Sequence, residues 1–408
     1  MFKKTLVLSV AVALVLMGLC SVASAAQNVA NTSQKGSLLI WPSITTEDGW
    51  DTIIMIGNDN TAGTTIKCLW MDWWQSVWNF EFPITANQPV WFKASDGSGG
   101  PSSNAVNGFG YDNIGELKCF AISFPANDGA PEQQIAWNHL YGSAIIFNAE
   151  RGIAFEYPAW AFTARGNVST GSAVGTPGQM LLTGGGAGTY DACPAYLLYN
   201  FFADRYVEPG ISPSSPSLAL SPCKQDLTQD RLPTCTKAKF DVWNENERKL
   251  TGAYRCVKCW YEGFLNEIDE PGFPFANPPG TNLSPKAGGF GQENFVYSSL
   301  HTATARFRVT GISGGNVCAG VFTTYDPLTG KLVDLCPASR QVAVPFVGLR
   351  ISELGLRMDS GLGPPAQLEG AALANTGSTA GAWVIPAGNP TPTILWDPAD
   401  GPQQAAGK

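Results

Sequence analysis

The sequence predicts an all-β protein built from two tandem antiparallel β-sandwich domains of the immunoglobulin-like kind. Turn-forming residues are abundant, with 45 Gly and 29 Pro among 408 residues. Short apolar runs lie between the turn signals, and no segment keeps a long helical period. Similar segments recur in the same order in both halves of the chain, which predicts an internal duplication.

The predicted strands follow the apolar runs. They include Ser37–Trp41, Thr52–Ile56, Thr65–Trp70, Glu116–Ser123 and Ala144–Phe147. Residues 195–204 fit a weak helix or a buried strand equally well, because a short apolar run has no diagnostic period.

Four pairs of segments carry the duplication. The pairs are Ser37–Pro42 with Ser217–Pro222, Thr52–Asn60 with Lys239–Asn246, Lys67–Trp70 with Lys258–Tyr261, and Glu116–Phe120 with Asn316–Ala319. The predicted organisation is a signal peptide at 1–26, a first sandwich at 35–207, a Pro/Ser-rich linker at 208–216, a second sandwich at 217–359 and a Gly/Ala/Pro-rich tail at 360–408. The alternative is that β-rich segments share a strand-turn-strand texture without a common origin.

The first residues are typical of a cleavable signal peptide. A basic head precedes an apolar run from Leu6 to Leu19, and small residues surround Ala25. The run is about 14 residues long, shorter than the roughly 20 residues that a membrane-spanning helix needs. We therefore expect an extracytoplasmic protein without a membrane span, located in the periplasm, on the cell surface or in the medium.

The cysteines predict a disulfide framework in such a protein. Ten are present, and Cys20 leaves with the signal peptide, so nine remain. Immunoglobulin-like sandwiches are pinned by a bridge between their two sheets, and a comparable spacing recurs in each half. The candidate pairs are Cys68 with Cys119 and Cys259 with Cys318, and the short-loop alternatives are Cys223 with Cys235 and Cys318 with Cys336. An odd number leaves at least one thiol, or a bridge between chains.

The charge balance constrains the partner. The formal net charge is −8, and charged residues make up 14% of the chain. Nucleic acid is not expected, because phosphate contacts need an excess of Lys and Arg. A protein or a glycan is the expected partner, and the oligomeric state stays open.

The densest aromatic signal lies in residues 68–82, CLWMDWWQSVWNFEF. Alternation along an unbroken strand places Trp70, Trp74 and Trp78 on one face and Trp73 on the other. One sandwich core cannot bury all four, so this stretch is a candidate platform for sugar rings or for a protein partner. Core packing is the alternative.

Oxygen-rich residues cluster at two places between predicted strands. They are Asn58, Asp59 and Asn60, and Asn244, Glu245 and Asn246. Loops of this kind bind calcium in some exported domains, which makes these residues candidate calcium ligands. The alternative is a hairpin turn, because Asn and Asp tolerate left-handed backbone conformations. No other cofactor is indicated.

No recognisable catalytic constellation is present. The two histidines, His139 and His301, are expected at strand ends. Residues 311–315 match the G-x-S-x-G pattern of a hydrolase elbow, but the flanking segments are predicted strands and an elbow needs a following helix. Cys256 and Cys259 lie in a predicted strand, which favours two structural bridges over a redox dithiol.

Five stretches carry a resemblance to a known family. They are Lys35–Trp41, Thr85–Gly97, Phe155–Ala164, Cys223–Asp230 and Lys237–Asn246. In these stretches the chain resembles a family of exported β-rich bacterial proteins from bacteria rich in multihaem cytochromes. The resemblance implies an envelope or extracellular setting and brings no established activity, cofactor or catalytic residue.

These observations predict a non-catalytic structural or interaction protein of the cell envelope or the extracellular space. Two alternatives stay open. One is a carbohydrate-binding protein that uses the tryptophan stretch as an exposed platform. The other is a secreted hydrolase whose acidic residues follow no recognisable framework.

Overall fold

The computed structural model describes most of the chain between residues 29 and 379. The described ranges are 29–72, 76–99, 106–123, 132–166, 171–177, 180–202, 211–213, 217–223, 235–264, 304–314, 318–358, 366–368, 372–375 and 378–379. The predicted signal peptide at 1–26 and most of the predicted linker and tail lie outside these ranges.

The described residues form antiparallel strands and one short 3-10 helix, which confirms the all-β prediction. The first ten strands are β1 (Leu38–Thr45), β2 (Trp50–Asn58), β3 (Thr64–Asp72), β4 (Val77–Ile84), β5 (Pro89–Lys93), β6 (Ile114–Ser123), β7 (Gln133–Gln134), β8 (Leu140–Asn148), β9 (Ile153–Pro158) and β10 (Trp160–Phe162). The later elements are β11 (Leu197–Phe202), β12 (Ile211–Pro213), β13 (Ser217–Pro222), β14 (Thr236–Asn244), β15 (Lys249–Val257), β16 (Tyr261–Phe264), β17 (Thr304–Ile312), β18 (Thr323–Tyr325), β19 (Leu332–Asp334), η3 (Ala338–Arg340), β20 (Phe346–Met358), β21 (Ala366–Leu368), β22 (Ala372–Asn375) and β23 (Ser378–Thr379).

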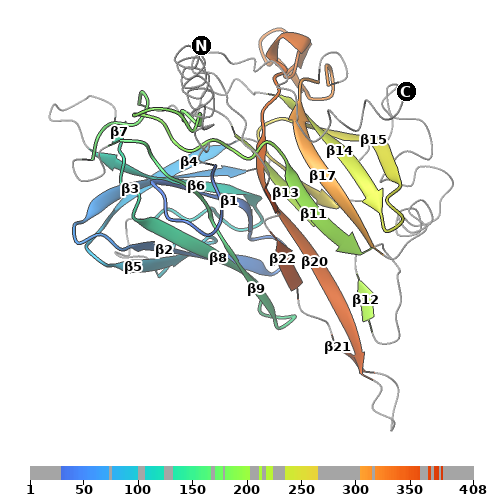
Figure 1. Ribbon diagram of the computed structural model, residues 1–408, viewed down its shortest axis with the longest axis horizontal. Helices are drawn as coiled ribbons and strands as arrows, with labels where there is room; N and C mark the ends of the chain where they lie inside the picture. Colours follow the sequence, from blue (N-terminus) through green and yellow to red (C-terminus); the bar gives the residue numbers. More distant parts are fainter. Residues whose placement is uncertain are drawn as a thin grey trace, which may run out of the picture.

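Four larger sheets and one two-stranded sheet contain these strands (Figure 1). Sheet A has the order β10-β1-β6-β3-β4, with β7 beside β6, and sheet B has the order β5-β2-β8-β9. Sheet C has the order β15-β14-β17-β11-β23, and sheet D has the order β12-β20-β13-β16, with β21 and β22 beside β20. The short hairpin of β18 and β19 projects beyond the sheets.

Sheets A and B pack face to face around an apolar core. Alternate residues of β2, such as Ile54 and Ile56, are buried in it together with Trp70 of β3 and Phe92 of β5. The alternation follows from the strand period of two, which directs successive side chains to opposite faces of a sheet.

Strands β1 and β6 of sheet A are buried on both faces. Leu39 of β1 contributes to the core with sheet B, whereas Leu38 and Ile40 belong to a second core. That second core also contains Phe240 and Phe307 of sheet C. Burying a large apolar side chain contributes about 1.5–3 kcal/mol, so this shared interior holds the two halves of the chain together.

Two strands from the predicted first domain and linker pair with strands of the second half. β11 falls inside the predicted first domain, but it pairs with β17 in sheet C, with Leu197 opposite Val309. β12 falls inside the predicted linker and pairs with β20. Within residues 195–204 the described part forms a strand rather than a helix, and Leu197, Tyr199 and Phe201 are its buried residues. The immunoglobulin-like type and the duplication stay predictions.

Four disulfides join eight cysteines. The pairs are Cys68–Cys119, Cys193–Cys223, Cys235–Cys336 and Cys256–Cys318. The ninth described cysteine, Cys259, is buried as a thiol. The expected pairs of Cys259 with Cys318, Cys223 with Cys235 and Cys318 with Cys336 are therefore wrong. Spacing along the chain does not reveal the observed pairs, because sheet packing brings together cysteines that are up to 101 residues apart.

The Cys68–Cys119 bridge lies within one sheet. The two residues are directly opposite each other on β3 and β6, with their Cα atoms 4.1 Å apart. Close pairs of this kind occur between adjacent antiparallel strands. The analogy with a bridge between two packed sheets is therefore wrong for this half of the chain.

The disulfides bear on the cellular location. Such bridges persist in oxidising compartments, so the framework indicates an extracytoplasmic protein. Within the described ranges, no helix has the length and apolar character needed to cross a membrane.

Candidate ligand-binding groove

The candidate site is a groove on the face of sheet B that points away from the core with sheet A. Two rows of residues cross this face because of the strand register. The first row is Trp91 on β5, Met55 on β2, Ser143 on β8 and Pro158 on β9. The second row is Pro89, Gly57 and Tyr141, one strand period further along. All seven residues line the groove.

Two aromatic side chains dominate the groove, and both are half exposed. The exposed fraction is 49% for Trp91 and 45% for Tyr141. A Cβ atom at Gly57 would overlap the Tyr141 ring, and a Cβ atom at Gly99 would overlap the Trp91 ring. Each glycine thus provides the space for its aromatic ring, and Gly99 also adopts a φ of +92° that other residues rarely tolerate.

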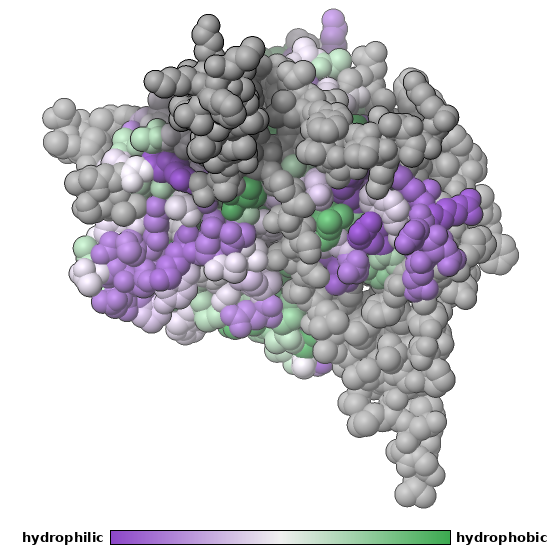
Figure 2. All heavy atoms as spheres, in the orientation of Figure 1, coloured by the Kyte–Doolittle hydropathy of each residue, from purple (hydrophilic) through white to green (hydrophobic). Residues whose placement is uncertain are grey.

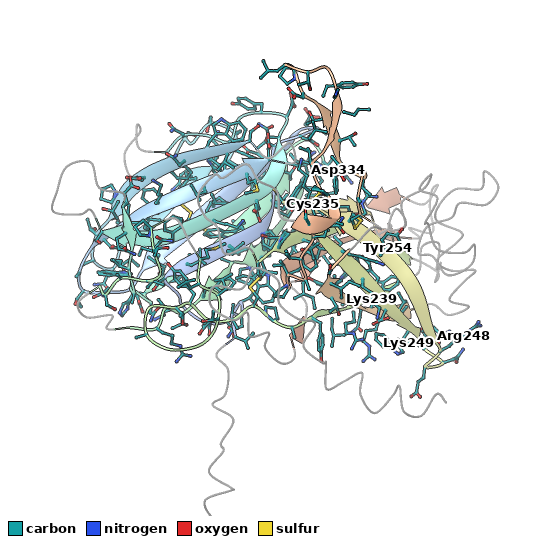
Figure 3. All side chains as sticks on the ribbon, turned by 90° about the horizontal axis from the view of Figure 1, so that it is seen from above. Cys235, Lys239, Arg248, Lys249, Tyr254 and Asp334 are labelled. Carbon is teal, nitrogen blue, oxygen red and sulfur yellow. A yellow bond between two sulfur atoms is a disulfide. The ribbon has the colours of Figure 1, made fainter. Side chains whose placement is uncertain are left out.

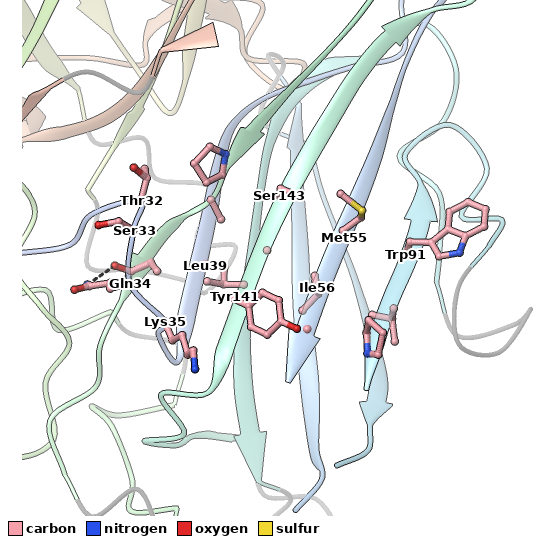
Figure 4. Close-up of a pocket in the computed structure, with 17 residues that line it drawn as sticks. Thr32, Ser33, Gln34, Lys35, Leu39, Met55, Ile56, Trp91, Tyr141 and Ser143 are labelled. Atoms are coloured by element: carbon pink, nitrogen blue, oxygen red, sulfur yellow. Dashed lines mark hydrogen bonds between the residues drawn. The ribbon is translucent and has the colours of Figure 1, made fainter. Parts of the chain in front are cut away.

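The segment before β1 forms a polar wall of the groove, which Figure 4 shows beside Tyr141. Gln34 fixes this wall, because its Nε2 donates to the carbonyl oxygen of Ala161 at 2.7 Å and to Oδ2 of Asp191 at 2.9 Å. Lys35 forms an ion pair with Asp59 at the end of the same wall. The hydrogen bond from Lys35 lowers the pKa of Asp59, so this carboxylate stays ionised beside its cation.

The groove has the size and chemistry of a small-ligand site. Its volume is about 580 Å³, within the range of roughly 300–1,000 Å³ that is usual for ligand pockets. The floor is apolar and aromatic, whereas Thr32, Ser33, Gln34 and Lys35 supply hydrogen-bonding groups along one side. Its described lining contains no carboxylate, histidine or cysteine, which suits binding better than proton transfer.

The sequence contained a signal for Trp91 that was missed. Val90 and Phe92 are 6% and 0% exposed, so Trp91 has the opposite orientation in a strand with a strict period of two. Tyr141 had no comparable signal, because its position over Gly57 depends on the register between β2 and β8.

The predicted tryptophan platform does not form as expected. Residues 68–82 are not one strand, since β3 ends at Asp72 and β4 begins at Val77, with Trp70 opposite Trp78. Trp70 is fully buried, and its Nε1 donates to the carbonyl oxygen of Asn107 at 2.9 Å. Trp78 is 39% exposed and contacts Phe109 edge-on.

Trp70 is therefore a core residue, where it packs against Phe80, Phe92 and Phe109. Trp73 and Trp74 lie outside the described residues. Among the described aromatic residues of this stretch, Trp70, Phe80 and Phe82 lie in the core and Trp78 is exposed.

The first calcium candidates have other partners. Oδ1 of Asn58 accepts hydrogen bonds from Trp137 and from the backbone of Asn60, and Asp59 pairs with Lys35 and His139. Asn60 Oδ1 accepts from the backbone of Ala62. These contacts are typical of Asx turns, which use the oxygens that a cation would need.

The second set forms the turn between β14 and β15. Asn244 Oδ1 accepts hydrogen bonds from the backbone of Asn246 and Arg248, and Glu245 is exposed in the same turn. In the part of the chain that the structure describes, no group of three or more His, Cys, Asp or Glu residues is placed to hold a metal ion.

His139 and the described residues of the G-x-S-x-G pattern make contacts that stabilise the fold. His139 packs edge-on against Trp137 and contacts Asp59 through Nδ1 at 2.9 Å. Gly311 is the penultimate residue of β17, and a Cβ atom there would overlap the carbonyl of Val344. Ser313 Oγ lies 3.4 Å from the carbonyl oxygen of Gln341. His301 and Gly315 lie outside the described residues.

A second polar cluster lies where the two halves meet. The register of β1 shifts between Trp41 and Ile44, which releases two carbonyl groups from the β-ladder. Trp260 Nε1 donates to the carbonyl of Pro42 at 2.6 Å, and the Tyr157 hydroxyl donates to the carbonyl of Ser43. The irregularity in β1 thus provides acceptors for side chains from both halves.

Glu262 completes this cluster. The Ser43 hydroxyl donates to Oε2 of Glu262 at 2.9 Å. The residue is partly exposed, but its carboxyl group is enclosed, and this burial raises the pKa to about 7. The nearby charge of Glu47 acts in the same direction, while the hydrogen bond from Ser43 opposes it. The site is enclosed, so a role in joining the halves fits it better than ligand binding.

The comparisons with known proteins add little to this geometry. No protein-family model matches the chain, and no curated protein matches it. Among solved structures, the crystal structure of the PBSX exported protein XepA is a distant neighbour. It has 9% sequence identity and a TM-score of 0.16, and the match covers 70% of this chain and 85% of that chain.

Proposed function

We propose that the protein is a non-catalytic, exported binding protein that takes an uncharged glycan in the groove of sheet B. The observation that carries this proposal is the pair of half-exposed rings, Trp91 and Tyr141, on one face of the sheet. Aromatic faces offer apolar contact to the C–H side of a sugar ring, and the polar wall at Thr32–Lys35 offers partners for its hydroxyl groups.

The lack of acidic groups in the described lining favours a neutral sugar and binding without cleavage. Lys35 is the charged residue of the lining, and Asp59 compensates its charge. Glycoside hydrolysis uses two carboxyl groups beside the scissile bond, and the groove supplies neither.

A glycan array with matched variants tests the proposal. Trp91→Ala and Tyr141→Ala are each expected to weaken binding of the best glycan by about tenfold or more, which corresponds to about 1.4 kcal/mol and is typical of removing an aromatic anchor from a binding site. Trp78→Ala is the control, because Trp78 is an exposed tryptophan on β4 outside the groove.

Two results would refute the glycan proposal. One is no binding by the parent protein to any neutral glycan. The other is a loss of binding in Trp78→Ala with none in Trp91→Ala, which would restore the tryptophan stretch as the binding surface. Without glycan binding, a structural role in the cell envelope becomes the better proposal.

The internal duplication is also kept as a proposal. β2 lies between β5 and β8 in sheet B, and β14 lies between β15 and β17 in sheet C. β1 pairs with β10 and β13 pairs with β20, which supports equivalent strands in the two halves. The predicted signal peptide at 1–26 and the family resemblance are part of the proposal that the protein is exported. N-terminal sequencing of the exported protein tests the predicted cleavage.

A further inference from the structure

The outer face of sheet C carries a concentration of positive charge. Lys237 and Lys239 alternate along β14, Arg306 and Arg308 alternate along β17, and Lys249 begins β15. The register confirms that these residues share a face, because Trp243 lies opposite both Lys249 and Arg306, and Asp241 lies opposite Arg308. Arg308 is buried against Asp241, whereas Lys237, Lys239, Lys249 and Arg306 are partly or fully exposed. We call these four exposed cations the basic face.

Two views show this region of the molecule. Figure 2 shows hydrophilic side chains over the region of β14, β15 and β17. Figure 3 labels Lys239 and Lys249 on the β14–β15 hairpin, with Arg248 at its tip. This concentration stands out in a chain whose net charge is −8.

Among the described residues, Asp241 is the carboxylate that contacts the cations of this face. Asp241 is 1% exposed, and its oxygens lie 2.7 Å from Arg308, 3.5 Å from Lys239 and 3.8 Å from Lys249. A single negative charge shared by three cations leaves an excess of positive charge. Burial and the neighbouring Lys239 charge lower the pKa of Lys237, which agrees with uncompensated positive charge along β14.

The aromatic residues of the face already hold cations. The charged groups of Arg306, Lys249 and Arg308 lie 5.0, 5.3 and 5.5 Å from the ring centre of Trp243. Lys237 lies 4.3 Å from the ring centre of Tyr254. These cation-π contacts fix the positions of the charges, and they leave the rings poorly placed to stack on nucleic-acid bases.

From this arrangement we propose that the basic face binds an acidic polysaccharide, a chain of sugar rings that carries regularly repeated carboxylate groups. The cations are spread over three adjacent strands, which lie about 4.8 Å apart, so an extended polyanion can contact several of them at once. Charge complementarity selects an anion, and the extracytoplasmic setting brings the face into contact with cell-surface polymers.

A membrane surface fits this face less well. Proteins that lie on anionic bilayers combine basic residues with apolar anchors. The exposed large hydrophobic side chains of the described residues lie elsewhere, and none is on β11, β14, β15 or β17. This proposal is independent of the glycan groove, because the two surfaces lie on different sheets.

The test compares polygalacturonate with other ligands at equal low salt. The full exported protein is titrated with polygalacturonate, with neutral dextran, with oligothymidine, and with phosphatidylcholine vesicles that contain phosphatidylglycerol. We expect the tightest binding to polygalacturonate and a steep loss of affinity as salt is added.

Paired variants assign the binding to this face. Lys239→Gln with Arg306→Gln is expected to weaken polygalacturonate binding about tenfold, because exposed ion pairs contribute roughly 0.2–1 kcal/mol each and the two act with their neighbours. Lys331→Gln with Arg151→Gln removes the same charge elsewhere and is expected to leave affinity within about twofold. If the first double variant does not fold, Lys237→Gln and Arg306→Gln are measured singly, with the same expectation of weaker binding.

Three results would overturn the proposal. They are no binding of polygalacturonate by the parent, an equal loss in both double variants, and tighter binding to oligothymidine or vesicles than to polygalacturonate.

Discussion

Glu262 allows a quantitative prediction about stability and pH. Its carboxyl group is enclosed between the halves of the chain, and the pKa in the folded protein is raised from 4.5 to about 7. In the unfolded chain the group returns to its ordinary pKa near 4.5. We predict that Glu262→Gln makes stability less dependent on pH and raises it at neutral pH and above.

The sign follows from proton binding. Between pH 4.5 and about 7 the folded protein holds the proton on Glu262 and the unfolded chain has lost it, so rising pH favours unfolding. The loss is complete above pH 7, where both states are ionised. A factor of ten in the proton equilibrium corresponds to about 1.4 kcal/mol. The raised pKa of Glu262 therefore lowers the free energy of unfolding above pH 7 by about 3 kcal/mol relative to its value below pH 4.5.

Glutamine keeps the shape and an acceptor for the Ser43 hydroxyl, but it never carries the charge. Urea unfolding of parent and variant across the range from pH 4.5 to above pH 7 measures the difference in the free energy of unfolding. As the pH rises through this range, the free energy of unfolding of the variant should increase by about 3 kcal/mol relative to that of the parent. Glu245→Gln, an exposed change in the β14–β15 turn, should leave the parent's pH profile unaltered. Parallel profiles for parent and Glu262→Gln would show that the carboxyl group is not held in an enclosed site.

Two further predictions address the framework of the fold. Peptide mapping of the non-reduced protein should identify the Cys256–Cys318 pair. Because Cys259 is buried, its thiol should react with iodoacetamide only after the protein unfolds. Labelling of Cys259 in the native protein would contradict its burial. Trp160→Phe removes the hydrogen bond from Nε1 to the carbonyl oxygen of Gly348, which is 3.0 Å long and buried between the halves. The loss should lower the free energy of unfolding, measured by urea titration, by about 1–3 kcal/mol. An unchanged urea midpoint would mean that this contact does not join the halves.

The sequence by itself determined the fold class and several strands. Short apolar runs between turn residues located the segments that became β1, β2, β3, β6 and β8, because a buried strand is apolar in its own residues and turn residues mark its ends. The cysteine content also indicated a disulfide framework, since oxidising compartments favour bridges. These are local or compositional properties, which one chain can show without its neighbours.

The tertiary structure decided which residues meet. The density of tryptophans in residues 68–82 placed Trp70 on a candidate surface. Trp70 instead lies in the core, because β3 and β4 form an antiparallel hairpin rather than one strand. Tyr141 lies over Gly57, and Arg306 lies beside Trp243, only because of the strand register. Cys318 pairs with Cys256 rather than Cys259, a difference of three residues that local spacing could not resolve. Contacts between distant strands depend on sheet order and register, and both are set by packing across the whole chain.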